Sequence, residues 1–326
     1  MHRSVIPWCD DTWNPITGCN NQCRYCYAYK ASRRFTGDIR QNLMSSEYRK
    51  NEELYILDNP FPSEIGGRLN YPFGYKPTYH RYRLNYPDER KHGCKILIGS
   101  MAETFGDWIP EQWLTEIFES CKRNERHNYL FLTKNPDRYE ELHDKGLLPL
   151  ADNFWYGTTL TDDNSYLPKL PKNAKTFICI EPILSDISIF NTESCLADWI
   201  IIGAETGTGN NKVIPKKEWV EKIIEYAMKL NIPIFLKDSL KPIMGANMKK
   251  EFPKELLERK MSSKESAKLM GECCKCKTYL RKNEMITLFS KSLRTEQPKT
   301  TAHICKKCFI EQCKEWEIKI PNLINL

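Results

Sequence analysis

Lys95-Ile96-Leu97-Ile98-Gly99 opens the part of the chain that decides the fold. This continuous apolar run predicts a buried strand, because a half-exposed strand would alternate apolar and polar residues. Residues 111–122 follow it, and Pro110 stands at the expected helix start. One face of that predicted helix carries Trp113, Leu114, Ile117, Phe118 and Cys121.

The same strand-then-helix unit recurs along the chain. The further predicted strands are 129–132, 154–157, 176–180, 199–203 and 232–236, and a strand within residues 4–17 must precede them. The most regular helix is predicted at 216–230, with an apolar face of Trp219, Val220, Ile223, Ile224, Ala227 and Met228. Buried strands that alternate with amphipathic helices indicate a parallel sheet covered by helices. Six or seven strands predict the α/β class, as a partial or complete barrel.

A polar loop near the amino end contains three cysteines in Gly18-Cys19-Asn20-Asn21-Gln22-Cys23-Arg24-Tyr25-Cys26-Tyr27. The C-x3-C-x2-C spacing is too tight for a pair of disulfides, whereas three thiolates can converge on one metal centre. A [4Fe-4S] cubane held by three cysteines keeps one iron without a protein ligand. The alternatives are unrelated thiols or a zinc site completed by Cys9.

This spacing, with Tyr25 before the last cysteine, resembles the signature of radical S-adenosylmethionine (SAM) enzymes. The resemblance implies catalytic Cys19, Cys23 and Cys26 that hold a [4Fe-4S] cluster, and SAM bound through its amino and carboxylate groups to the open iron. One electron then cleaves SAM to methionine and a 5'-deoxyadenosyl radical. It also implies the radical SAM partial (β/α)6-type TIM barrel.

Polar residues follow each predicted strand, where parallel barrels place their chemistry. Ordinary loop polarity explains any one of them, but the shared register favours a site for a zwitterionic cofactor that carries a ribose. Glu103 is the first candidate for the SAM ammonium, and Glu181 or Thr158 for the ribose. The full set of predicted cofactor-binding residues is Tyr25, Ser100, Glu103, Thr133, Lys134, Thr158, Glu181, Glu205 and Lys237.

Length and composition narrow the class of protein. A chain of 326 residues predicts one large domain and a small appendage. The first residues show no secretory leader and no run is long enough to span a membrane, so a cytoplasmic protein is expected. Fourteen cysteines in that compartment indicate metal binding more than disulfides. The net charge of +7 falls to roughly +4 once ligating thiolates and metals are counted, so basicity is weak evidence for nucleic acid.

Residues 44–92 form a predicted insertion rich in tyrosine, proline and arginine. Tyrosines next to arginines suit the stacking of a nucleobase, but packing of the insertion over the barrel explains them equally well. Long connections in compact domains are usually functional or disordered. The tyrosines are 71, 75, 79, 82 and 86, and the basic residues are Arg81, Arg83 and Arg90.

A second cysteine module lies near the carboxy end, after a boundary predicted near residue 245. Cys273 and Cys276 form one C-x2-C knuckle, and Cys305 and Cys308 form another. Two such knuckles predict a small zinc-ribbon-like module with four cysteine ligands within residues 246–326. Cys274 and Cys313 are additional thiols, which keeps an auxiliary iron–sulfur cluster as the alternative.

Motifs beyond the cysteines are similar to a phage-associated family of radical SAM-type proteins of unknown function, marked by TWNPITGC and CYA. The resemblance covers residues 7–245 and supplies no substrate. Where radical SAM enzymes have Gly-Gly-Glu, this chain has Ser100-Met101-Ala102-Glu103. Only Glu103 matches that element, so its role in binding SAM is implied by the glutamate alone. The matching stretches are 12–19, 26–28, 77–84, 98–101, 132–136, 180–182 and 203–207.

These patterns predict a radical SAM enzyme that abstracts hydrogen from a nucleic acid or a nucleoside. Its expected partners are that substrate and an electron donor such as a flavodoxin or ferredoxin, without a membrane. Two alternatives stay open: a peptide-modifying enzyme with an auxiliary cluster, and a metal-stabilised binding protein without turnover.

Overall fold

The computed structural model describes residues 4–191, 197–206 and 212–257, the backbone of four strands between 269 and 305, and residue 309. The chain divides into two compact units, Met1–Lys260 and Met261–Leu326.

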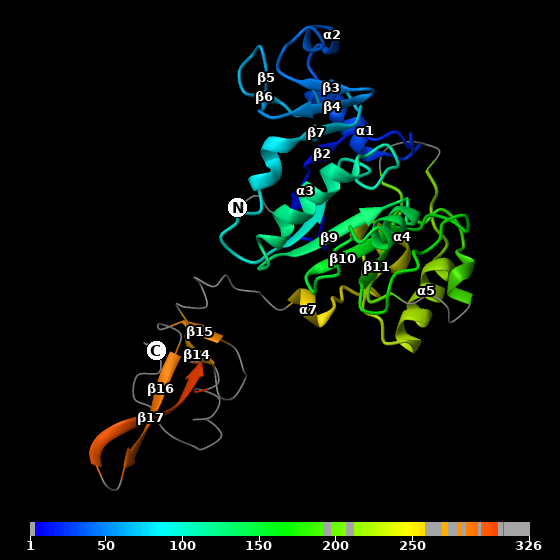
Figure 1. The fold of residues 1–326 in the computed structure, drawn as a ribbon. Helices are drawn as coiled ribbons and strands as arrows, with labels where there is room; N and C mark the ends of the chain where they lie inside the picture. Colours follow the sequence, from blue (N-terminus) through cyan, green and yellow to red (C-terminus); the bar gives the residue numbers. More distant parts are fainter. Residues whose placement is uncertain are drawn as a thin grey trace. The chain divides into compact units, whose positions relative to one another are not determined.

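A seven-stranded sheet forms the centre of the first unit (Figure 1), and its strands pair in chain order. All adjacent pairs are parallel. The first and last strands lie at opposite edges, so the sheet is an open half-barrel and the prediction of a partial barrel is confirmed. The strands are β1 (Asp11–Trp13), β8 (Lys95–Ile98), β9 (Asn128–Thr133), β10 (Phe154–Thr159), β11 (Lys175–Ile180), β12 (Ile200–Ile202) and β13 (Ile234–Leu236).

The longest helices form where the apolar periodicity predicted them. Helix α3 spans Glu111–Lys122 and buries the expected face, and Pro110 is its N-cap. Helix α5 spans Lys217–Lys229, close to the predicted range. Its predicted face was wrong at Met228, which is 60% exposed, because Tyr226 is buried instead with its ring 5.3 Å from that of Phe190. The other α-helices among the described residues are α1 (Tyr27–Ser32), α2 (Ile39–Asn42), α4 (Asp137–Asp144), α6 (Lys241–Met244) and α7 (Lys254–Leu257).

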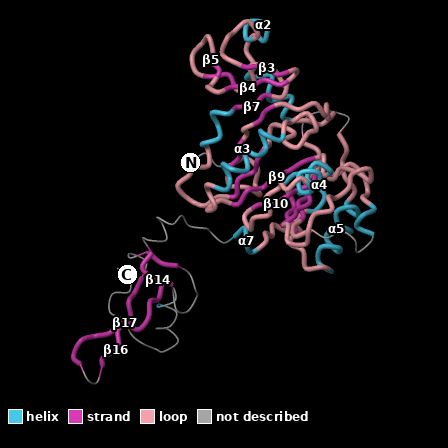
Figure 2. Tube along the Cα trace, in the orientation of Figure 1, coloured by secondary structure: helices cyan, strands magenta, loops and turns pink. Residues whose placement is uncertain are grey.

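In two connections the described residues do not form the expected α-helix. No helix forms between β10 and β11, a connection that the structure describes throughout. Pro168 and Pro171 lie in this connection, and proline lacks the N–H that a helix interior needs. Between β11 and β12, the described residues contain the short 3-10 helix η3 (Ser188–Asn191). Figure 2 shows loops next to β10 and between the helices α4 and α5.

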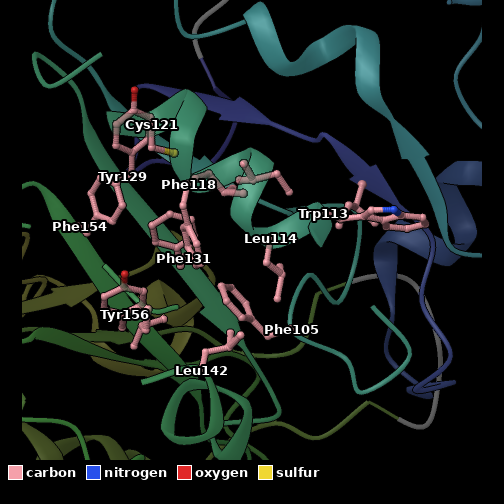
Figure 3. Close-up of a cluster of buried hydrophobic side chains, with 14 of the residues drawn as sticks. Phe105, Trp113, Leu114, Phe118, Cys121, Tyr129, Phe131, Leu142, Phe154 and Tyr156 are labelled. Atoms are coloured by element: carbon pink, nitrogen blue, oxygen red, sulfur yellow. The ribbon is translucent and has the colours of Figure 1, made fainter. Parts of the chain in front are cut away.

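Side chains on the two faces of the sheet pack into different cores. Residues on the helix-covered face, such as Phe131 and Tyr156, stack with ring centroids 5.4 Å apart and pack under α3 and α4 (Figure 3). Alternate residues such as Leu130 and Trp155 point into the half-barrel, where they pack with Trp8 and other apolar residues. This period of two explains why the strands read as continuous apolar runs.

The predicted strand at 4–17 is split in two. The segment Asp11–Trp13 joins the parallel sheet, whereas β2 (Ile16–Thr17) pairs antiparallel with β7 (Thr78–His80). Pro15 stands between the two pieces and cannot donate a ladder hydrogen bond.

The predicted insertion builds a small sheet instead of a loop. Strands β2, β7, β4 (Leu54–Leu57) and β3 (Arg49–Asn51) pair in that order. The strands β5 (Phe61–Pro62) and β6 (Arg68–Leu69) of the insertion form a separate antiparallel pair. The 3-10 helix η2 (Arg81–Asn85) follows β7.

The tyrosines and arginines of this insertion are used mainly for packing. Tyr79 is fully buried and stacks on Trp113 at 4.7 Å, and Tyr71 is 6% exposed. Arg81 pairs with Glu116 at 3.1 Å. The structure therefore shows the packing alternative for these residues, not a stacking platform.

The first unit extends past the boundary predicted near residue 245. The Leu236 N–H donates to the Lys249 carbonyl at 2.8 Å, and Lys250 bridges Phe235 antiparallel. Because this segment covers the edge of β13, it belongs to the barrel. The second unit contains two antiparallel pairs, β14 (Leu269–Glu272) with β15 (Tyr279–Arg281) and β16 (Met285–Ser292) with β17 (Thr295–Cys305).

Two buried histidines make stability depend on pH. Burial, with Arg83 and Arg68 nearby, holds the pKa of His80 well below its usual value, and burial lowers the pKa of His127 to about 4. Both rings are neutral in the folded protein at pH 7, whereas the unfolded chain protonates them near pH 6.5. The unfolded state then binds more protons, so we expect the unfolding free energy to fall as pH drops below about 6.5.

Urea denaturation between about pH 7.5 and pH 5 measures this loss. The double variant His80→Asn/His127→Asn cannot take up these protons and should lose less stability over the same interval. An unfolding free energy that stays constant or rises on acidification in the unaltered chain contradicts the assignment.

In the part of the chain that the structure describes, no helix combines the length and the apolar character needed to cross a bilayer.

Candidate functional site

The cysteine loop reaches the carboxy-terminal edge of the half-barrel through Gly18. The Gly18 N–H donates to the Met101 carbonyl at 3.0 Å, and the Cys19 N–H donates to the Tyr75 carbonyl at 3.1 Å. Gly18 has a φ of +86°, and a Cβ added there would lie 2.3 Å from the Lys76 carbonyl oxygen. Only glycine fits this position, which fixes the first cysteine between the barrel and the insertion.

The three cysteine thiols of this loop are half-buried. The Asn21 N–H donates to the Cys19 sulfur at 3.3 Å, and the Tyr29 N–H donates to the Cys26 sulfur at 3.3 Å. Cys26 is also the N-cap of α1 (Tyr27–Ser32). Backbone N–H donors to sulfur stabilise negative charge there, and such bonds are one means by which proteins tune iron–sulfur clusters.

The surroundings of Cys19 disfavour a bare thiolate at that residue. Burial raises the pKa of Cys19 to about 12, with smaller contributions in the same direction from Glu103 and the other two thiols, and the Asn21 hydrogen bond opposes the rise. A cationic centre that neutralises the three sulfurs would remove that penalty. The donor set therefore fits an iron–sulfur cluster.

Among the described residues, no group of three or more His, Cys, Asp or Glu side chains is arranged to hold a metal ion. In a cubane each cysteine binds a different iron, so its three sulfurs do not meet at one point. Cys9 does not complete a zinc site, because its thiol is buried against Ser4 Oγ at 3.3 Å, among the apolar residues inside the half-barrel.

Glu103 anchors the loop to the end of β9. It is 5% exposed, and its carboxylate accepts from the Thr133 hydroxyl at 2.6 Å and the Lys134 N–H at 2.9 Å. The Phe105 N–H and the Asn21 amide complete its partners, at 3.2 and 3.5 Å. Burial raises its pKa, and these hydrogen bonds oppose the rise. The residue predicted to bind an ammonium group is thus already surrounded by donors of the chain.

We expect Glu103→Ala to lower the unfolding free energy by about 3 kcal/mol, because the substitution leaves several buried donors without an acceptor. The matched control is Glu119→Ala on an exposed helix surface, which should change stability by no more than about 0.5 kcal/mol. Denaturant unfolding of both variants measures the difference. Equal effects would show that the Glu103 network contributes no stability.

A cavity of about 170 Å³ lies where the loop meets β9 and β10. Tyr25, Lys134 and Thr158, three of the nine predicted cofactor-binding residues, line it together. Lys134 Nζ donates to the Tyr25 hydroxyl at 2.7 Å and lies 4.9 Å from the centre of its ring. The buried Thr158 hydroxyl has no partner within the described residues, so a bound ligand hydroxyl could supply one.

Sequence reasoning missed the other wall of this cavity. Asp162, Asn164, Ser165 and Tyr166 come from the loop after β10. The polar run 161–165 directly after that strand was the available signal. Because we expected a helix after this strand, these polar residues were not predicted to belong to a site.

Two ion pairs span the ends of the later strands. Lys237 pairs with Glu181 across the end of β12, where a Cβ on Gly203 would lie 3.0 Å from Lys237 Cδ. Arg24 of the loop contacts Glu205 at 3.1 Å, and the Val213 N–H donates to the same carboxylate at 3.0 Å. The structure therefore places these predicted residues at the mouth, paired with each other or with the loop.

Ser100 contacts the loop through its backbone. Its carbonyl accepts from the Tyr27 hydroxyl at 2.7 Å, and its hydroxyl donates to Asn14 at 3.2 Å. Tyr27 was not predicted as a site residue. Of the carboxy-terminal cysteines, Cys305 ends β17, and Cys273, Cys276 and Cys308 lie outside the described residues.

Comparison with known protein families gives a match over most of the chain. A model described as "Protein of unknown function (DUF5131)" matches residues 3–275, which include the whole half-barrel and the cysteine loop. No curated protein and no solved structure matches the chain.

Proposed function

The chain belongs to the DUF5131 family, whose function is unknown, and from that premise we propose that it is a radical SAM enzyme. The observation that carries the proposal is the cysteine loop at the mouth of a parallel half-barrel. Its three half-buried sulfurs lie in a loop fixed by Gly18 and by Glu103, and two of them accept backbone N–H bonds.

In this proposal Cys19, Cys23 and Cys26 hold a [4Fe-4S] cluster. When bound, the cluster supplies the electron that cleaves SAM to methionine and a 5'-deoxyadenosyl radical. The residues of the chain bind and orient. The Lys134–Tyr25 pair and the Thr158 hydroxyl line the adjoining cavity, where a ribose-bearing molecule can find hydrogen-bond partners. The paired Glu181 and Lys237 place opposite charges at the ends of β11 and β13.

The proposed substrate is a nucleic acid or nucleoside. The tyrosines and arginines of the insertion do not support it, because they pack within the fold. The lysines and arginines of residues 249–282 remain as its support, since contacts to phosphates need such residues. The competing proposal is a peptide-modifying enzyme whose carboxy-terminal cysteines hold an auxiliary cluster.

Metal analysis separates these two proposals. About four irons with one zinc per chain favours the first, and about eight irons favours the second. In either case, anaerobic reconstitution followed by dithionite and SAM should yield 5'-deoxyadenosine. Samples without SAM or without dithionite are the controls. A fully loaded protein that forms none is a metal-stabilised binding protein, not an enzyme of this class.

A further inference from the structure

The segment that follows the cysteine loop exposes large apolar side chains together with basic ones. We call this the α1–α2 surface: Tyr29, Arg33, Arg34, Phe35, Arg40 and Met44, which extend from α1 to just beyond α2 (Ile39–Asn42). Tyr29 is 53% exposed, Phe35 51% and Met44 87%. Exposed large apolar side chains that gather in one place mark an interaction site.

The positive charges of this surface have no partners in the described chain. Lys30, Arg33, Arg34 and Arg40 are all exposed, and none forms an ion pair with another described residue. Asp38 is the one acidic residue between 27 and 44, and its carboxylate accepts the Arg40 N–H at 2.9 Å as the cap of α2. The surface is therefore positive and is not neutralised from within its own stretch.

Both halves of the α1–α2 surface rest on one segment of the insertion. The Tyr29 ring packs edge-on against Tyr75 at 5.6 Å. Ile39 lies against the adjacent Gly74, whose added Cβ would be 3.3 Å from Ile39 Cδ1. The Tyr71 N–H donates to the Phe35 carbonyl at 3.3 Å. These contacts make the surface continuous, and it begins at Cys26, the N-cap of α1.

The composition indicates a protein partner. Aromatic residues, methionine and arginine are enriched in protein–protein interfaces, whereas lysine and acidic residues are depleted. Single-stranded nucleic acid is bound mainly by aromatic and basic residues. Such a partner would not explain why the aliphatic side chains of Ile39, Leu43 and Met44 are exposed here. The unpaired cations favour an acidic partner through charge complementarity.

We propose that the α1–α2 surface is the docking site of an acidic electron-donor protein. This inference rests on the proposed function, because that reaction consumes one electron per turnover and the surface adjoins the cysteine loop. The donor is oxidised by one electron and the cysteine-bound centre is reduced by one electron, and no atom is transferred. Electrostatic attraction steers the encounter, so association weakens as salt rises.

A flavodoxin is the probe, and the test variant is Arg33→Glu/Arg34→Glu/Arg40→Glu. Calorimetric titration of the full chain should show binding that weakens with salt and is at least about tenfold weaker in the test variant. The matched control is Lys172→Glu/Lys216→Glu/Lys254→Glu, with the same charge change at exposed positions on other segments. This control should bind as the unaltered chain does.

A second readout separates docking from chemistry. With dithionite, the test variant should form 5'-deoxyadenosine at the unaltered rate, but with reduced flavodoxin the rate should fall at least about tenfold. Equal flavodoxin binding by both triple variants, or no binding by the unaltered chain, overturns the proposal. So does a labelled single-stranded oligonucleotide that binds the surface in place of flavodoxin. No product with dithionite in the unaltered chain defeats the proposed function instead, whatever the binding result.

Discussion

Replacing Cys19, Cys23 and Cys26 together with serine is expected to remove about four irons per chain and to abolish 5'-deoxyadenosine formation. A serine hydroxyl does not replace a thiolate as a ligand of iron in such a cluster. The three sulfurs also share one loop, so no other described cysteine can take their place. Iron and sulfide are measured after anaerobic reconstitution, together with the visible absorption of the cluster.

The matched control for this triple variant is Cys94→Ser. Cys94 is also half-buried and free, but its thiol donates to the His92 carbonyl at 3.1 Å, a bond that a serine hydroxyl can form. This variant should load iron as the unaltered chain does. A triple variant that keeps its full iron content would place the cluster elsewhere, with the carboxy-terminal cysteines as the alternative.

Replacing Gly18 with alanine is expected to displace the cysteine loop. The positive φ of +86° costs an alanine about 1–2 kcal/mol. The larger effect is steric, because the new methyl group would lie 2.3 Å from the Lys76 carbonyl oxygen, which is backbone and cannot rotate away. We expect both a lower unfolding free energy and a loss of most of the iron.

Gly66 gives the matched control for this variant. Its φ of +90° is nearly the same, but a Cβ added there meets nothing within 4 Å. Gly66→Ala should therefore show the backbone cost alone and keep its iron. Similar losses in the two variants would mean that the close approach of Gly18 to Lys76 does not position the cysteines.

The parts of the fold that could be predicted depend on local patterns. Helix α3 begins after Pro110 and carries its apolar residues at helical spacing, so its bounds follow from the sequence. The parallel strands are buried on both faces and appear as short apolar runs. Their order follows because parallel neighbours joined by crossovers tend to be sequential.

The parts that could not be predicted depend on contacts between distant residues. Met228 matches the helical period, yet Tyr226 packs on Phe190 and takes the buried position. The tyrosines of the insertion appeared suited to stacking on a ligand, but Tyr79 is covered by Trp113. The spacing of residues along the sequence does not show that Phe190 packs against Tyr226 or that Trp113 covers Tyr79.

The candidate site divides in the same way. The cysteines and the polar strand ends were visible in the sequence, because a short motif and a repeated register identify them. The partners of Glu103 and the closeness of Lys134 to Tyr25 were not, because the fold brings these residues together from different strands and loops. The residues after β10 that line the cavity were not predicted, because a helix was expected in that connection.

The most direct measurement is electron paramagnetic resonance of the anaerobically reconstituted and reduced protein, before and after SAM is added. If Cys19, Cys23 and Cys26 hold a cubane with an open iron, the spectrum shows a reduced [4Fe-4S] signal that shifts when SAM binds. A signal that SAM leaves unchanged, or zinc in place of iron on these three sulfurs, contradicts the proposed chemistry.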